Sequence, residues 1–155
     1  MPDLNGGWYA QNSHIRGTFT AHWISAAAYL IAEVPNARLK AKMDHIVDEI
    51  RRCQIENGGK LGFPIPPKYI YGVKEGKTYW APLYVCNKVF MGLLDVYQLT
   101  HNQTTLDIIT GCGEWFTEFT SSTSRQELSE MMDSQETGGL MEIWGDLYQA
   151  TQNEC

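Results

Sequence analysis

The side chains best placed for binding chemistry early in the chain are Arg16 and His22, which flank a loop marked by a glycine. The loop leads into residues 20–33, where apolar residues recur at intervals of three and four, the pattern of a mostly apolar helix. Thr18 or Thr20 is expected to cap its first turn, whose unpaired N–H groups then point back into the loop. This arrangement predicts a site for a polar ligand. The alternative for His22 is a histidine hydrogen-bonded inside a helical core.

A second group of candidate binding residues lies in the proline- and aromatic-rich stretch 60–82, which the sequence predicts to be a long connection. Loops of this length in compact domains are commonly functional. Tyr69, Tyr71 and Trp80 therefore predict contact with a sugar or a protein partner. The alternative is that these rings cover the edge of the core, as partly buried Tyr and Trp do in many domains.

Helical segments must position both groups of residues. After the helix at 20–33, the break at Val34-Pro35-Asn36 precedes an amphipathic helix that ends at Asn57-Gly58-Gly59, a sequence suited to a left-handed C-terminal cap. Apolar periodicity predicts the remaining helices over about 82–100, 106–119 and 126–132, and from 140 onward.

The turns between these helices repeat along the chain, at 32–39, 99–106 and 150–155. In the first two hairpins a more apolar helix precedes the turn and a more amphipathic helix follows it, as expected when inner and outer helices alternate around a ring or solenoid. The third hairpin stops at its turn. We therefore expect an all-α fold in which residues 1–155 form one partial domain of a longer helical toroid, truncated at its C-terminal side.

Composition excludes several classes of partner. The 12 basic residues are scattered among 18 acidic ones, for a net charge of -6, which argues against a nucleic-acid surface. No apolar run is long enough to span a bilayer, and the first residues do not resemble a signal peptide, so we expect a cytoplasmic protein with no membrane partner. Four widely spaced cysteines predict reduced, mostly packed thiols: Cys53, Cys86, Cys112 and Cys155.

Several separate blocks, in order, resemble the catalytic domain of glycoside hydrolase family 127, the β-L-arabinofuranosidase-like proteins. The resemblance covers nearly the whole chain and implies an (α/α)6 barrel of inner and outer helices, in agreement with the hairpin repeat. The blocks include Ile15-Arg16-Gly17-Thr18-Phe19-Thr20-Ala21-His22-Trp23, Met43-Asp44-His45, Trp80-Ala81-Pro82, Gly92-Leu93-Leu94-Asp95 and Gly138-Gly139-Leu140-Met141-Glu142.

The resemblance also implies that the starts of the inner helices face a sugar pocket. His22 matches the histidine of the first block and is expected to hydrogen-bond substrate or a pocket residue. Glu142, in the first turn of the last helix, is favoured there by the helix dipole and could accept a sugar hydroxyl. Asn87 stands where the family usually has a histidine; an amide can bind a hydroxyl but cannot carry a proton. With Arg16 and Trp80, these residues form the expected substrate-binding set.

Family members use a zinc-bound cysteine nucleophile, held with further cysteines and a glutamate, and another glutamate as general acid/base. None of the four cysteines here matches those positions, so we assign this chain no catalytic residue, metal ligand or cofactor. We expect the N-terminal part of a retaining glycoside hydrolase acting on terminal L-arabinofuranosides or similar sugars, with negligible turnover by this chain alone. The alternative is a non-catalytic glycan- or protein-binding module. Self-association is expected under either, through the truncated edge around Leu140, Ile143, Trp144 and Leu147.

Overall fold

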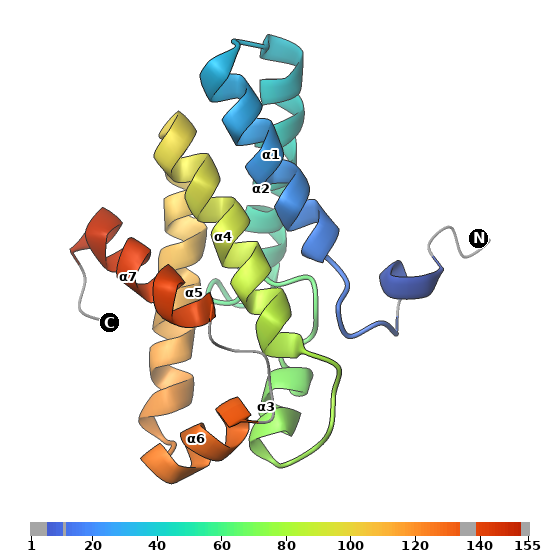
Figure 1. The fold of residues 1–155 in the computed structure, drawn as a ribbon, viewed down its shortest axis with the longest axis vertical. Helices are drawn as coiled ribbons and strands as arrows, with labels where there is room; N and C mark the ends of the chain where they lie inside the picture. The colour runs from blue at the N-terminus through green and yellow to red at the C-terminus, as the bar shows by residue number, and fades with distance from the viewer. Residues whose placement is uncertain (1–5, 11, 134–138, 153–155) are drawn as a thin grey trace.

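The computed structural model describes residues 6–10, 12–133 and 139–152, and within those ranges the chain is helical, with no strand. The all-α prediction is therefore confirmed (Figure 1). A 3-10 turn, η1, precedes the α-helices. The bounds of the elements are η1 Gly7–Tyr9, α1 Thr18–Glu33, α2 Ala37–Glu56, α3 Lys68–Lys74, α4 Pro82–Thr100, α5 Gln103–Ser121, α6 Arg125–Asp133 and α7 Gly139–Thr151.

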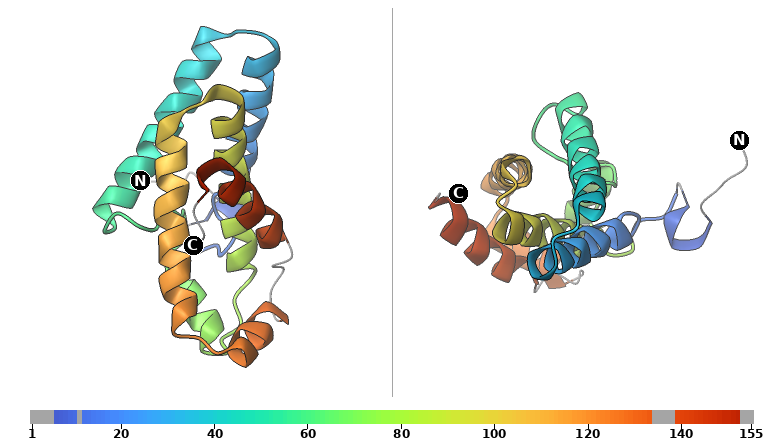
Figure 2. Two further views of the ribbon diagram at one scale, coloured as in Figure 1. Left: turned by 90° about the vertical axis from the view of Figure 1, so that its left-hand side faces the viewer. Right: turned by 90° about the horizontal axis from the view of Figure 1, so that it is seen from above.

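The long helices form two layers, as an incomplete α/α barrel requires. Seen from above in Figure 2, α1, α4 and α7 lie in one layer, while α2 and α5 lie in the other. Helix α4 packs against α1 on one side and α7 on the other, and α2 packs against both α1 and α5. The more apolar helix of each predicted hairpin is therefore an inner helix, and its amphipathic successor is an outer one.

The inner helices α1 and α4 approach each other closely because small residues line their contact. A side chain at Gly92 would place its Cβ 2.5 Å from the carbonyl oxygen of Ala21. Ala28, one of the α1 residues buried with Ala21, is likewise small and fully buried. One helical turn beyond Gly92, Asp95 accepts a 2.6 Å hydrogen bond from Ser25 Oγ. Backbone contact and this hydrogen bond together fix the register between the two helices.

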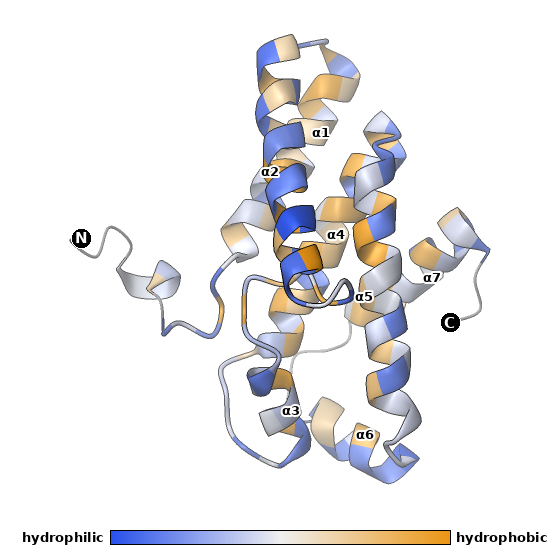
Figure 3. Cartoon of the chain, turned by 180° about the vertical axis from the view of Figure 1, so that it is seen from behind, coloured by the Kyte–Doolittle hydropathy of each residue, from blue (hydrophilic) through white to orange (hydrophobic). Residues whose placement is uncertain are grey.

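The outer helix α2 begins and ends as predicted. Asn36 caps it by accepting a hydrogen bond from the backbone N–H of Leu39 (3.0 Å), and Gly58 and Gly59 follow it with φ values of 93° and 86°. Figure 3 shows mostly hydrophilic residues along the outward side of α2. None of the helices in the described part of the chain is both long and apolar enough to cross a membrane.

Two local predictions are wrong. Neither Thr18 nor Thr20 caps α1: the cap position is Gly17, with φ of 95°, and the Thr18 hydroxyl instead donates to the carbonyl of Ile15. Glycine is required there because a Cβ would lie 2.1 Å from the ring of Pro64.

The predicted connection 60–82 contains the short helix α3, which the sequence analysis missed. Its apolar pattern consists of only two buried side chains, Ile70 and Val73, too few to show a helical period. Gly72 also interrupts the pattern, and it is needed because a Cβ there would lie 2.4 Å from the ring of Tyr79. Tertiary packing therefore selects this helix more than local preference does.

Candidate functional site

The inner helices line a cavity of about 440 Å3, to which α1, α4 and α7 each contribute. We call it the inner cavity. Its walls combine amide, hydroxyl, carboxylate and ammonium groups with a few apolar side chains, a lining suited to a polar ligand that also has an apolar face. The lining residues are Ser25, Tyr29, Asn87, Lys88, Met91, Leu94, Asp95, Gln98, Gly139, Glu142, Ile143 and Asp146.

Asn87 is the most unusual member of this lining. Its side chain is only 8% exposed, yet it has no hydrogen-bond partner elsewhere in the described part of the chain. Its amide fills the space beside Gly139, where a Cβ would stand 2.7 Å from Asn87 Nδ2. Buried side-chain amides are nearly always satisfied, so an unsatisfied one in a cavity wall indicates a place for a ligand.

Three carboxylates also line the inner cavity. Glu142 lies in the first turn of α7, where the helix dipole stabilises a negative charge, and Asp146 follows one turn later. Asp95 faces them from α4. Burial raises the pKa of Asp95, and the charge of Asp146 raises it further, while hydrogen bonds from Ser25 and Tyr29 act in the opposite direction.

The raised pKa of Asp95 predicts a pH effect on stability. Because the folded state holds this proton more tightly than the unfolded state, the free energy of unfolding falls as pH rises from the ordinary aspartate pKa through the raised one. Asp95→Asn removes this contribution. We therefore expect the stability of the variant, measured relative to wild type by urea denaturation, to increase as pH rises from the ordinary aspartate pKa of about 4 through the raised pKa of Asp95.

The control for this experiment is Asp48→Asn, a substitution on the exposed side of α2. A difference between Asp95→Asn and wild type that stays constant with pH, or that shrinks as pH rises, would contradict the assignment. The measurement needs no knowledge of the ligand.

The structure separates the predicted substrate-binding residues. Asn87 and Glu142 share the inner cavity, but His22 is exposed on α1 and is not among the cavity-lining residues. The histidine is therefore not buried in the helical core. Arg16 donates through Nε and Nη2 to the carbonyl oxygen of Pro64, at 3.3 and 3.0 Å, and so ties the loop before α1 to the loop after α2.

Trp80 lies away from the inner cavity, at the end where the inner helices begin. It is 56% exposed and meets the exposed ring of Trp8 edge to face at 5.8 Å, while its backbone N–H donates to His14 Nδ1. Tyr69 and Tyr79 pack against each other and around His14. Part of the aromatic stretch thus covers the core edge, and part remains accessible.

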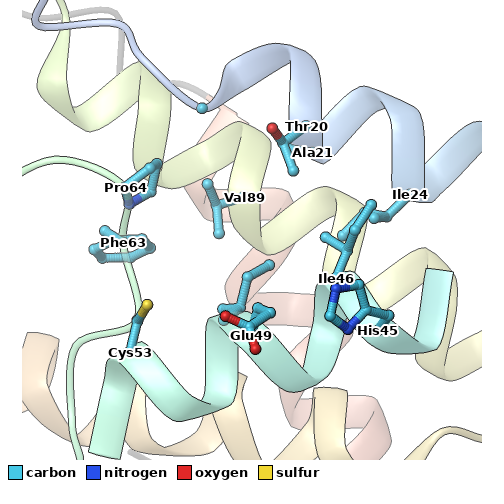
Figure 4. Close-up of a pocket in the computed structure, with 13 residues that line it drawn as sticks. Thr20, Ala21, Ile24, His45, Ile46, Glu49, Cys53, Phe63, Pro64 and Val89 are labelled. Carbon is cyan, nitrogen blue, oxygen red and sulfur yellow. The ribbon is translucent and has the colours of Figure 1, made fainter. Parts of the chain in front are cut away.

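A second cavity, of about 310 Å3, opens between α1 and α2 (Figure 4). Its walls are almost wholly apolar, including Ile24, Phe63 and Val89, with His45 and Glu49 at its α2 side. So few polar groups do not suit a sugar, whose hydroxyls each need a hydrogen-bond partner. The inner cavity is therefore the better candidate for a carbohydrate site.

The described cysteines do not fit a zinc-thiolate centre. Burial raises the pKa of Cys86 well above the ordinary value and that of Cys112 to about 11, so both thiols stay protonated at neutral pH. Cys53 is exposed and lines the apolar cavity, not the inner one. Cys155 lies outside the described residues. Among those residues no group of three or more His, Cys, Asp or Glu side chains is arranged to hold a metal ion.

Ser25, Asp95 and Asp146 also line the cavity but are not among the residues predicted from the sequence, although a sequence signal for two of them was present. Asn87, Met91 and Asp95 recur at intervals of four on one helix, and Glu142 and Asp146 do so on another, so each set shares a helix face. Ser25 carried no such signal, because only the packing of α1 on α4 brings it to Asp95.

Comparison with known proteins identifies the family of this chain. A search of curated proteins finds no match. The profile of the β-L-arabinofuranosidase GH127 catalytic domain matches residues 3–155, nearly the whole chain. The chain therefore belongs to the GH127 catalytic-domain family, a family of glycoside hydrolases.

Proposed function

We propose that the inner cavity binds a terminal L-arabinofuranosyl or similar sugar, and that this chain supplies one wall of the substrate pocket of a retaining glycoside hydrolase. The observation that carries the proposal is the buried amide of Asn87 in the cavity wall, for which the described residues supply no hydrogen-bond partner. Of two neighbouring sugar hydroxyls, one can accept from its Nδ2 while the other donates to its Oδ1, which satisfies both ends of the amide.

The rest of the wall complements a small sugar. Glu142 and Asp146 accept hydrogen bonds from hydroxyls, Lys88 donates to ring or hydroxyl oxygens, and Met91 provides an apolar surface for the C–H face of the ring. In this proposal these residues bind and orient the sugar. No bond-breaking step is assigned to them, and no step is assigned to zinc, because the described cysteines do not fit that metal.

Asn87→Leu tests the proposal, since leucine has a similar shape but no polar atoms. We expect binding of methyl β-L-arabinofuranoside, followed by saturation-transfer NMR, to weaken by about tenfold or more, because a site built to hydrogen-bond a hydroxyl loses those bonds. The free energy of unfolding should stay equal or rise by about 1 kcal/mol, because the variant no longer buries an amide that lacks a partner in the described part of the chain.

These two readouts separate ligand binding from a structural role. If Asn87 only stabilised the fold, the variant would lose stability and keep its affinity for any sugar that wild type binds. Glu114→Ala on the outer helix α5 serves as a matched surface control and should change neither quantity. Absence of any transfer signal with the wild-type chain at millimolar sugar would overturn the proposal.

The second candidate function is a non-catalytic binding module, which the exposed Trp8–Trp80 pair favours. Both rings are more than half exposed, and aromatic pairs of this kind can stack on a glycan or dock a partner. The same NMR experiment separates the two candidates: loss of the signal in Trp80→Ala but not in Asn87→Leu would favour the module.

A further inference from the structure

The inner cavity carries an excess of negative charge. Its lining contains three carboxylates, Asp95, Glu142 and Asp146, and one basic side chain, Lys88. The ammonium group of Lys88 lies over the ring of Tyr84, 5.2 Å from its centroid, and forms no ion pair with a carboxylate in the described part of the chain. The described residues therefore leave the carboxylates of this cavity without a counter-ion.

Two of these carboxylates also have no hydrogen-bond partner. Glu142 and Asp146 stand about one turn apart on α7, and neither side chain accepts a hydrogen bond from another described residue. On α4, burial raises the pKa of Asp95 and the charge of Asp146 raises it further, so these two carboxylates repel each other. Because α4 and α7 pack directly on each other, this arrangement of charge is set within the chain itself. A positive charge in the cavity would relieve the repulsion.

A buried amide in the same cavity indicates independently that a ligand binds there. Asn87 is only 8% exposed, lines the cavity and has no hydrogen-bond partner in the described part of the chain. Gly139 packs on this amide, and Glu142 follows three residues later, about 4.5 Å further along α7. A ligand that is hydrogen-bonded to Asn87 therefore has its other substituents within reach of Glu142.

We infer that the inner cavity favours a sugar that carries a protonated amine over a neutral sugar of the same shape, with Glu142 and Asp146 accepting hydrogen bonds from its ammonium group. The inference rests on the proposed function, which places the sugar hydroxyls at Asn87. A hydrogen bond between two charged groups is roughly twice as strong as one between neutral groups. An ammonium group also has three N–H donors, so it can bond to both carboxylates at once.

An organic cation suits this cavity better than a metal ion does. A metal ion needs several ligand atoms that converge on one point, and no group of three or more His, Cys, Asp or Glu side chains is arranged in that way among the described residues. An ammonium group can instead bond to carboxylates on separate turns of α7. The hydroxyls of the same molecule then bond to Asn87, and its C–H face lies on Met91.

Two sugars that differ only in charge test the inference. The 5-amino-5-deoxy derivative of methyl β-L-arabinofuranoside replaces a hydroxyl outside the ring with a primary amine, which is protonated at neutral pH. We expect the whole chain to bind this amino sugar about tenfold more tightly than methyl β-L-arabinofuranoside in isothermal titration calorimetry. Acetylation of the amine removes the charge and should abolish the preference. Raising NaCl from about 20 to about 500 mM should weaken binding of the amino sugar alone, by about threefold or more.

Variants of the two carboxylates test where the ammonium group binds. Glu142→Gln and Asp146→Asn each remove one negative charge with little change in shape. Each should reduce the preference for the amino sugar, which is the ratio of the two affinities, by about threefold or more. Glu114→Gln removes the same charge from an exposed position on α5 and should leave this ratio unchanged. The cavity variants should keep the circular dichroism spectrum of wild type, because neither carboxylate bonds to another described residue.

The outcomes separate this inference from the proposed function. Equal binding of the amino sugar and the neutral sugar would overturn the inference alone. So would a preference that Glu114→Gln reduces as much as Glu142→Gln does, since the cause would then be the net charge of the chain. Ethanolamine carries the ammonium group without a sugar, and binding as tight as that of the amino sugar would also overturn the inference. Absence of binding by either sugar would overturn both the inference and the proposed function.

Discussion

Gly92→Ala should lower the free energy of unfolding by about 2 kcal/mol or more, although alanine is normally the better helix former by about 1 kcal/mol. The reason is steric. A Cβ at this position would lie 2.5 Å from the carbonyl oxygen, 3.0 Å from the carbonyl carbon and 3.1 Å from the Cα of Ala21. These are backbone atoms that no side-chain rotation can move, so α1 must shift away from α4. Urea denaturation followed by circular dichroism measures the loss.

Gly145→Ala is the matched control for this prediction. Gly145 also lies inside an inner helix, α7, but a Cβ there would meet no atom within 4 Å. Helix preference alone then applies, and we expect stability to rise by up to about 1 kcal/mol. Two glycine-to-alanine changes of opposite sign would establish close packing of α1 on α4. A stabilising effect at both positions would contradict it.

The shift caused by Gly92→Ala should also reach the candidate site. Ser25 of α1 donates to Asp95 of α4 one turn beyond Gly92, and both residues line the inner cavity. If α1 moves outward, this 2.6 Å hydrogen bond lengthens and the wall opens. We therefore expect Gly92→Ala to weaken the sugar binding that we propose for this cavity as well, whereas Gly145→Ala should leave it unchanged.

Gln54→Leu should cost about 3 kcal/mol of stability, because Gln54 is a fully buried polar side chain that joins three segments. Its Nε2 donates to the carbonyl oxygens of Lys60 (2.7 Å) and Ile108 (2.9 Å), and its Oε1 accepts from Arg51 Nη1 (2.5 Å). Leucine fills the space but leaves the Lys60 carbonyl without this donor. The end of α2, the loop that follows and α5 then lose their common hydrogen-bonding residue.

The control is Gln126→Leu, at an exposed position on α6 where the side chain donates to Glu130. We expect a change within about 0.5 kcal/mol there, as for most surface substitutions. Equal, small effects at both glutamines in urea denaturation would show that the buried network contributes little. A large loss of stability in Gln54→Leu alone would confirm that Gln54 links α2, the loop that follows it and α5.

Much of this fold could be predicted from the sequence because the signals are local. Apolar periodicity gave the long helices, Asn36 gave the cap of α2, and Gly58 and Gly59 gave its end, since each depends on residues within a few positions. The alternation of more apolar and more amphipathic helices gave the inner and outer layers. Packing explains some residues of the family blocks. Gly92 and Asp95, which belong to one block, both lie where α4 contacts α1.

Other features depend on contacts between distant residues, which no local pattern encodes. Gly17 caps α1 in place of a threonine because Pro64, distant in the sequence, occupies the space of a Cβ. Gly111 lies within α5, where glycine normally weakens a helix. Packing favours glycine there because a Cβ would lie 3.0 Å from Gln54 Nε2. The missed helix α3 depends on the ring of Tyr79, which fits over Gly72.

The sequence by itself determined which residue types the candidate site contains, and only the tertiary structure decided which of them meet. Asn87 and Glu142 share a cavity because α7 starts at a glycine that packs on the Asn87 amide. Arg16, His22 and Trp80 lie elsewhere, although all three stand near inner-helix starts. The reason is physical: helical periodicity sets the face on which a side chain lies, but the direction of that face is set by packing between helices.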